Sequence, residues 1–311
     1  MIAAGIDIGT NTALMVVASI LPDGTIQILE DVHELPRLGE GLDRTGMICE
    51  EARNRGLDAM RRFRHVLHSV APASSSRFVT AVATSALREA QNGDAVRAEL
   101  EETLGWPIEV IPGNREATLT FGGAVGVSND LSLMIDIGGG STEYACGTAG
   151  DVHYAQSTSI GVVRFMERYS NAYPISRDAR IAAREHVRAE LRPHVTSLSH
   201  ASSVVATAGT PTALAMIDLG LPAFDATRIE GYVLSRQRVT ELSDYLCSLS
   251  LDELRAIPGL DERRADIIPM GALILSESLE ILDYNALRVT TRGLRYGALH
   301  VARDTAMKVQ R

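Results

Sequence analysis

The chain has 311 residues, of which 45% are hydrophobic, and its formal net charge is −9. A negative balance disfavours non-specific binding to nucleic acids or anionic membranes, and no apolar run reaches the roughly 18 residues that span a bilayer. The first residues also lack a basic region followed by an apolar stretch and a cleavage site, so we expect a cytoplasmic protein without a nucleic-acid or membrane partner.

The first half of the chain alternates between strand and helix patterns, with residues 71–76 reading as a loop. The expected elements are strands at about 2–8, 12–20 and 25–31, a helix at 49–70, a strand at 77–83, a helix at 85–104, a strand at 108–111 and a helix at 114–124.

The second half repeats this alternation, which is typical of an α/β architecture. We expect hairpin strands to about 158, helices at 160–170 and 176–199, a strand at 203–207, helices at 211–219, 235–249 and 262–282, a strand at 286–290 and a last helix from Gly293. The sequence therefore predicts two domains, one of residues 1–122 completed by the helix at 293–311 and one of residues 123–292.

The stretch LSLMIDIGGGSTEYAC, residues 131–146, places three glycines between two acids. Glycine lacks a Cβ, so such a turn can direct consecutive N–H groups at a phosphate. Asp136 and Glu143 would repel a bare phosphate, which points to a bridging Mg²⁺. The same pattern is also typical of a tight hairpin with solvated acids.

A second copy of this unit lies at residues 3–18, AAGIDIGTNTALMVVA, where Asp7 and Gly9 correspond to Asp136 and Gly138. Thr10 corresponds to the second glycine of the other turn. Two related halves of one chain commonly enclose a ligand between them. The repeat therefore favours a ligand site over a simple hairpin.

Three other residues and one further glycine turn are candidates for catalysis or anion binding. Glu116 falls in the first turn of an expected helix, where it either complements the helix dipole or takes a proton from water. Arg88 follows a strand and an expected Thr84 cap, as either an anion ligand or a solvated charge. Arg37 lies among apolar and glycine residues, and VVATAGTPTAL, residues 204–214, forms another strand, glycine turn and helix.

Lys308 is the only lysine, so the chain contains no GK[ST] motif and no P-loop. Any cationic contact to a phosphate must therefore come from arginine, whose planar group suits bidentate binding.

The paired turns GIDIGTNT and IDIGGGSTE resemble the phosphate-binding motifs of the actin-like superfamily. Together with ATSALREA and PGNREATLTF they resemble the exopolyphosphatase/guanosine pentaphosphatase (Ppx/GppA) family. LPRLGEGLD, SIGVVRFME, TAGTPTALA, PGLDERRADIIPMGALIL and TTRGLRYGAL extend this resemblance over nearly the whole chain.

The resemblance implies an α/β fold of two actin-like (ribonuclease H-like) domains around a central cleft. It implies a hydrolase of phosphoanhydride bonds that uses Mg²⁺ to remove the terminal phosphoryl group of inorganic polyphosphate. Glu116 then corresponds to the water-activating base, and Asp7, Asp136 and Glu143 to the metal-associated acids. The candidate phosphate-binding residues are Gly9, Thr10, Asn11, Thr12, Arg37, Arg88, Gly138, Gly139, Gly140, Ser141, Gly209 and Thr210.

Several alternatives stay open at this point. Guanosine pentaphosphate offers the same terminal bond as polyphosphate, and an actin-like kinase or a non-catalytic alarmone sensor would use the same turns. Longer family members append a helical domain of HD phosphohydrolase type, and this sequence resembles the short two-domain form. A homodimer would lengthen a shared groove for a linear polyanion.

Overall fold

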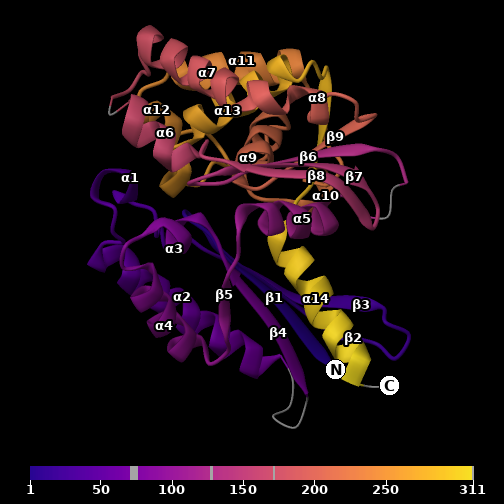
Figure 1. Ribbon diagram of the computed structural model, residues 1–311. Coiled ribbons are helices and arrows are strands. Elements are labelled where there is room, and N and C mark those ends of the chain that lie inside the picture. The colour runs from indigo at the N-terminus through magenta and orange to yellow at the C-terminus, as the bar shows by residue number, and fades with distance from the viewer. Residues whose placement is uncertain (71–75, 127–128, 171, 310–311) are drawn as a thin grey trace. The chain divides into compact units, whose positions relative to one another are not determined.

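The structure is a computed structural model that describes residues 1–70, 76–126, 129–170 and 172–309. It divides into two compact units, Met1–Gly123 with Leu294–Arg311, and Ala124–Gly293 (Figure 1). We refer to them as unit 1 and unit 2. Apart from Ser76, the loop expected at 71–76 lies outside the described residues, as do the last two residues of the expected C-terminal helix.

Unit 1 is built on a five-stranded sheet of order β3-β2-β1-β4-β5. Strands β1, β4 and β5 are parallel, whereas β1, β2 and β3 form an antiparallel meander. Its elements are β1 (Ile2–Ile8), β2 (Ala13–Ile20), β3 (Ile26–Glu34), α1 (Leu42–Thr45), α2 (Glu50–Ser69), β4 (Arg77–Ala83), α3 (Ser85–Glu89), α4 (Gly93–Leu104), β5 (Ile108–Val110), α5 (Gly113–Ala124) and α14 (Leu294–Val309).

The two faces of this sheet are covered by different helices because strand side chains alternate between faces. Ile6 and Ile8 of β1 belong to the core that includes Phe63 of α2, whereas Ala3 packs on the face covered by α14. At Gly5 an added Cβ would lie 2.0 Å from the carbonyl oxygen of Arg295. Glycine is therefore required here for α14 to approach the strand, and Figure 1 shows this helix beside β1 and β4.

Unit 2 is built on a six-stranded sheet of order β10-β11-β9-β6-β7-β8, in which β6, β9 and β11 are parallel. Its elements are β6 (Ser132–Ile137), β7 (Thr142–Thr148), β8 (Asp151–Thr158), α6 (Val162–Tyr169), α7 (Arg177–Leu191), η1 (Arg192–His194), α8 (Val195–Leu198), β9 (Ser203–Thr207), α9 (Gly209–Asp218), α10 (Ala226–Ile229), β10 (Val233–Ser235), α11 (Arg236–Ser248), α12 (Leu251–Arg255), η2 (Glu262–Arg264), α13 (Ile268–Ile281) and β11 (Ala286–Val289).

Helix α13 is the centre of the core of unit 2. Its residues from Ile268 to Leu279 are all buried, and it contacts α6, α7, α9 and α11. The hydroxyl groups of Tyr144 on β7 and Ser278 on α13 are hydrogen bonded at 2.8 Å, which satisfies both polar groups inside this core.

The meander followed by a parallel strand occurs in both units, since β6, β7, β8 and β9 repeat the pairing of β1, β2, β3 and β4. The predicted α/β class is confirmed, with one mixed sheet in each of the two units. No helix of the described residues has the length and apolar character needed to cross a bilayer.

Three expected helices differ from the structure. The helix expected at 85–104 is interrupted between Glu89 and Gly93, and an added Cβ at Gly93 would lie 2.1 Å from the carbonyl oxygen of Leu87. The helix expected at 176–199 ends at Leu191 and is followed by a 3₁₀ turn, Arg192–His194, that contains Pro193. The helix expected from 262 begins only at Ile268, with Pro269 in its first turn.

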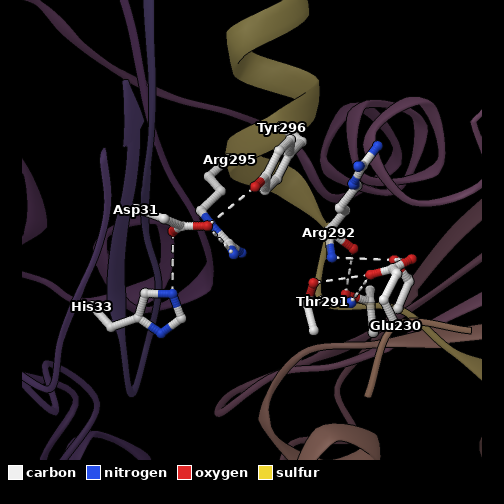
Figure 2. A network of polar contacts seen from close by, with 9 residues as sticks. Asp31, His33, Glu230, Thr291, Arg292, Arg295 and Tyr296 are labelled. Carbon is white, nitrogen blue, oxygen red and sulfur yellow. Dashed lines mark hydrogen bonds and ion pairs between the residues drawn. The ribbon is translucent and has the colours of Figure 1, made fainter. Parts of the chain in front are cut away.

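A polar network fastens α14 to the edge strand of unit 1 (Figure 2). The Nε and Nη2 groups of Arg295 each donate to one carboxylate oxygen of Asp31 at 2.9 Å, and the hydroxyl of Tyr296 donates to the same carboxylate at 3.1 Å. Burial would raise the pKa of Asp31, but hydrogen bonds and charges from His33 and Arg295 outweigh it and hold the pKa at about 2. The carboxylate is therefore ionised throughout the neutral range.

We predict that Asp31→Asn lowers the free energy of unfolding at pH 7 by about 2–3 kcal/mol, because Arg295, with a side chain only 6% exposed, loses its carboxylate. A folded-state pKa below the unfolded value gives stability that is complete above the unfolded pKa and fades as pH falls from about 4 to 2.

Urea unfolding of both proteins over this pH range measures the effect. Asp304→Asn, which removes an exposed carboxylate of the same helix, is the control and should change stability by less than about 0.5 kcal/mol. A pH-independent difference between Asp31→Asn and the parent would contradict the assigned titration.

Candidate active site

The candidate residues of unit 1 gather where its parallel strands end. The N–H of Thr84, after β4, donates to the carbonyl of Ile8 at the end of β1 at 3.1 Å. The N–H of Ile111, after β5, donates to Ala83 at 3.0 Å. The segments that follow β1, β4 and β5 are therefore neighbours at the carboxyl edge of the sheet, where ligands of open α/β sheets bind.

The turn after β1, residues 9–12, is closed by a hydrogen bond from the N–H of Gly9 to the carbonyl of Thr12 at 2.9 Å. The hydroxyl of Thr10 is hydrogen bonded to that of Ser85 on α3 at 2.8 Å. Asp7 lies two residues before this turn and is half-buried. The turn is thus joined to the neighbouring segment after β4.

The carbonyl groups of this turn are held by residues 36–41, which follow β3. The N–H of Gly39 donates to Thr10 at 2.8 Å and that of Arg37 donates to Asn11 at 3.1 Å. Arg37 has a φ of 51°, a left-handed conformation that costs a non-glycine residue roughly 1–2 kcal/mol. Residues held in such conformations cluster at functional sites.

Asn11 is buried, with only 7% of its surface exposed. Within the described part of the chain its Oδ1 atom accepts no hydrogen bond. A buried amide oxygen without a donor is destabilising unless a ligand supplies one. This oxygen is an acceptor and cannot contact a phosphate oxygen directly, so a bound water is the partner that its chemistry favours.

Glu116 lies in the first turn of α5 and is 6% exposed. The Nη1 group of Arg88 donates to its Oε2 atom at 3.1 Å and to the carbonyl of Ile111 at 2.8 Å. Arg88 thus connects the segments after β4 and β5. Thr84 is the N-cap residue of α3, but its side chain makes no capping hydrogen bond.

The turn after β6 in unit 2, residues 138–141, repeats the closure seen in unit 1. The N–H of Gly138 donates to the carbonyl of Ser141 at 2.9 Å. The carbonyls of Gly138 and Gly139 accept from the N–H groups of Val162 and Val163 at 3.0 and 2.9 Å. The side chain of Arg164 donates to Gly140 at 3.0 Å.

These bonds fix the orientation of the glycine turn. Over the described residues, no protein oxygen accepts from the N–H groups of Gly139, Gly140 or Ser141. Successive N–H groups of this kind form an anion-binding concavity. The arrangement fits the predicted phosphate site.

Asp136 and Glu143 are directly opposite each other on the antiparallel strands β6 and β7. Opposite residues of such strands point to the same face of the sheet. Glu143 is 1% exposed, and its Oε1 atom accepts a hydrogen bond from Ser157 at 2.6 Å. Two carboxylates fit Mg²⁺, which commonly takes one or two from a protein and completes its octahedron with water and phosphate.

The described ranges contain no cluster of three or more His, Cys, Asp or Glu side chains placed to hold a metal ion. In its own unit, Asp7 is opposite Leu14 rather than a second acid. Of the three predicted metal ligands, Asp136 and Glu143 are therefore the two that lie opposite each other within one unit.

The segments after β9 and β11 complete the carboxyl edge of unit 2. Gly209 and Thr210 start α9, and an added Cβ at Gly209 would lie 2.4 Å from Nη1 of Arg264. The hydroxyl of Thr207 donates to the carbonyl of Arg292 at 2.6 Å. Figure 2 shows Glu230 accepting from Thr291, whose N–H and hydroxyl each lie 2.9 Å away.

Sequence reasoning missed two arginines of unit 2. Arg164 contacts the glycine turn, and Arg264 lies against Gly209. Burial lowers the pKa of Arg264, while nearby Asp261 opposes that change. In the sequence, Arg264 belongs to the charged run DERRAD, which is typical of a solvated surface. The sequence signal that could have identified Arg164 is its position shortly after the expected strand end at residue 158.

The model of the Ppx/GppA phosphatase family matches residues 16–304. Among solved structures, an exopolyphosphatase from Cytophaga hutchinsonii is 28% identical, with a TM-score of 0.88 over 98% of each chain. An exopolyphosphatase-like protein is also 28% identical, with a TM-score of 0.90 over 98% of this chain and 100% of the other. The Ppx/GppA family member of Aquifex aeolicus is 25% identical, with a TM-score of 0.80 over 100% of this chain and 99% of that one.

We predict that Gly161→Ala disrupts the candidate phosphate turn of unit 2, because the added Cβ would lie 2.3 Å from the carbonyl carbon of Gly140. Inorganic pyrophosphate with Mg²⁺ should raise the melting temperature of the parent protein by mass action and raise that of the variant much less. Thermal unfolding with and without pyrophosphate measures this difference.

Gly122→Ala is the control, since an added Cβ there meets no atom within 4 Å. It should keep the full response to pyrophosphate. An equal response in Gly161→Ala would contradict the role given to the glycine turn.

Proposed function

This chain belongs to the Ppx/GppA phosphatase family, and on that basis we propose that it hydrolyses the terminal phosphoanhydride bond of inorganic polyphosphate. The products are orthophosphate and a polyphosphate one unit shorter. The relatives include an exopolyphosphatase that is 28% identical over nearly the full length of both chains.

The observation that carries this proposal is the buried carboxylate of Glu116, held by Arg88 at the carboxyl edge of unit 1. Hydrolysis needs a base that orients water and accepts its proton. The contact of Arg88 with Oε2 of Glu116 holds the orientation of this carboxylate. In this proposal Arg88 holds the carboxylate of Glu116, and it also makes the phosphate contact expected from the sequence.

The proposed reaction has one displacement step. The oxygen of a water attacks the terminal phosphorus, while a water proton passes to the carboxylate of Glu116. The bond between this phosphorus and the bridging oxygen breaks, and the bridging oxygen leaves with the shortened chain. Since phosphoryl transfer passes through a loose transition state, alignment and neutralisation of charge account for most of the catalysis.

The remaining candidate residues bind the substrate in this proposal. The N–H groups of residues 139–141 donate to phosphoryl oxygens, and the 9–12 turn offers the same backbone arrangement in unit 1. Asp136 and Glu143 would hold Mg²⁺, which supplies positive charge to the phosphoryl oxygens when bound. Asp7 is the corresponding acid of the first turn.

We predict that the purified protein with Mg²⁺ releases orthophosphate from long-chain polyphosphate without any acceptor, and that a chelator stops the release. Glu116→Gln should lower kcat by about 10²–10⁴ with the fold retained, because the amide cannot take a proton from water. A phosphate assay under steady-state conditions measures both effects.

Glu109→Gln serves as the control, because it removes an exposed carboxylate from the neighbouring strand and should keep the parent rate. A parent-like rate in Glu116→Gln would refute the base. Release that requires an acceptor hydroxyl would identify a kinase instead. Release from guanosine pentaphosphate but not from polyphosphate would reassign the substrate, and no release from either would favour a sensor.

A further inference from the structure

The same kind of segment holds the phosphate turn in each unit. In unit 1, the N–H groups of Arg37 and Gly39 occupy the carbonyls of Asn11 and Thr10. In unit 2, the segment after the third strand likewise occupies the carbonyls of residues 138–140. We call residues 36–41 the unit 1 strap. The orientation of the 9–12 turn depends on this strap.

The strap is itself held by one side chain of α2, that of Arg55. Its Nε group donates to the carbonyl of Pro36 at 2.8 Å. Its Nη2 group donates to the carboxylate of Glu40 at 2.5 Å. Between these two contacts, Leu38 is fully buried, and an added Cβ at Gly56 would lie 3.1 Å from its Cδ2 atom.

The backbone of the strap needs such a restraint. Arg37 is held at a φ of 51°, and the N–H of Glu40 donates to its carbonyl at 3.0 Å. A residue keeps this conformation only where its surroundings over-determine it. Arg55 fixes the strap on both sides of Arg37, at Pro36 and at Glu40.

We propose that Arg55 is a positioning residue for the phosphate turn of unit 1 and acts through the strap. It binds no substrate, and its kinetic consequence rests on the proposed function. Loss of its two contacts lets residues 36–41 move, so that the N–H groups of Arg37 and Gly39 leave the turn. The N–H groups of Asn11 and Thr12, which share peptide units with the carbonyls of Thr10 and Asn11, then lose their fixed direction.

The structural contribution of Arg55 can be separated from this role. The side chains of Arg55 and Glu40 are 39% and 51% exposed, and ion pairs with this exposure contribute little to stability. Arg53, on the same helix, makes a comparable pair with Glu99, at 2.8 Å from Nε and 2.6 Å from Nη2. Arg53→Gln therefore removes the same charge and a similar pair without touching the strap.

The test compares Arg55→Gln with Arg53→Gln and the parent protein. Amide hydrogen exchange at Arg37 and Gly39 should be at least tenfold faster in Arg55→Gln alone, because these are the N–H groups that hold the turn. The unfolding midpoints of the two variants should agree. For polyphosphate, kcat/KM should fall about tenfold in Arg55→Gln and stay at the parent value in Arg53→Gln.

A second substitution reaches the strap from its own side. Glu40→Gln removes the same ion pair, and the double variant with Arg55→Gln should be no worse than Arg55→Gln, since Arg55→Gln alone already removes that pair. Additive losses would overturn the proposal. So would parent-like exchange at Arg37 and Gly39 in Arg55→Gln, or faster exchange without a loss of kcat/KM beyond that of Arg53→Gln.

These readouts also separate the two proposals. If the parent protein releases no phosphate from polyphosphate, the proposed function fails. Hydrogen exchange and the response of the melting temperature to pyrophosphate then decide the role of Arg55, because neither readout requires turnover.

Discussion

The candidate phosphate turn of each unit depends on one backbone constraint, which is that its carbonyl groups are already occupied. In unit 1 the carbonyls of Thr10 and Asn11 accept from the strap, and in unit 2 those of residues 138–140 accept from the start of α6 and from Arg164. Fixing a carbonyl also fixes the neighbouring N–H group, because the peptide unit is planar. The N–H groups of each turn are therefore oriented in advance, which is the arrangement that would stabilise charge in the proposed phosphoryl transfer.

The glycines of these turns follow from this constraint. Gly39 lies where an added Cβ would be 2.1 Å from the side chain of Thr10, and Gly161 lies where one would be 2.3 Å from Gly140. In each unit the segment that holds the turn must approach it more closely than any side chain allows. Each copy of the repeated turn therefore also requires a glycine in a later segment of the chain, which is Gly39 in unit 1 and Gly161 in unit 2.

The sequence was sufficient for the features that local patterns encode. The repeated Ile-Asp-Ile-Gly run predicted both hairpins, and the alternation of strands and helices predicted the α/β class. It was insufficient where contacts join distant segments. Arg88 and Glu116 are 28 positions apart in sequence, and nothing in either motif indicates that they form an ion pair. The close approach of Gly93 to the carbonyl oxygen of Leu87 is likewise a contact that periodicity does not report.

The most direct test of this account is to follow the backbone amide resonances of Thr10, Asn11, Gly139 and Gly140 while inorganic pyrophosphate is added in the presence of Mg²⁺. Saturable shifts of these amides, with Gly105 and Gly150 in other turns unchanged, are the predicted result. Binding of pyrophosphate that leaves all four amides unchanged would contradict the claim that the two turns donate to phosphate.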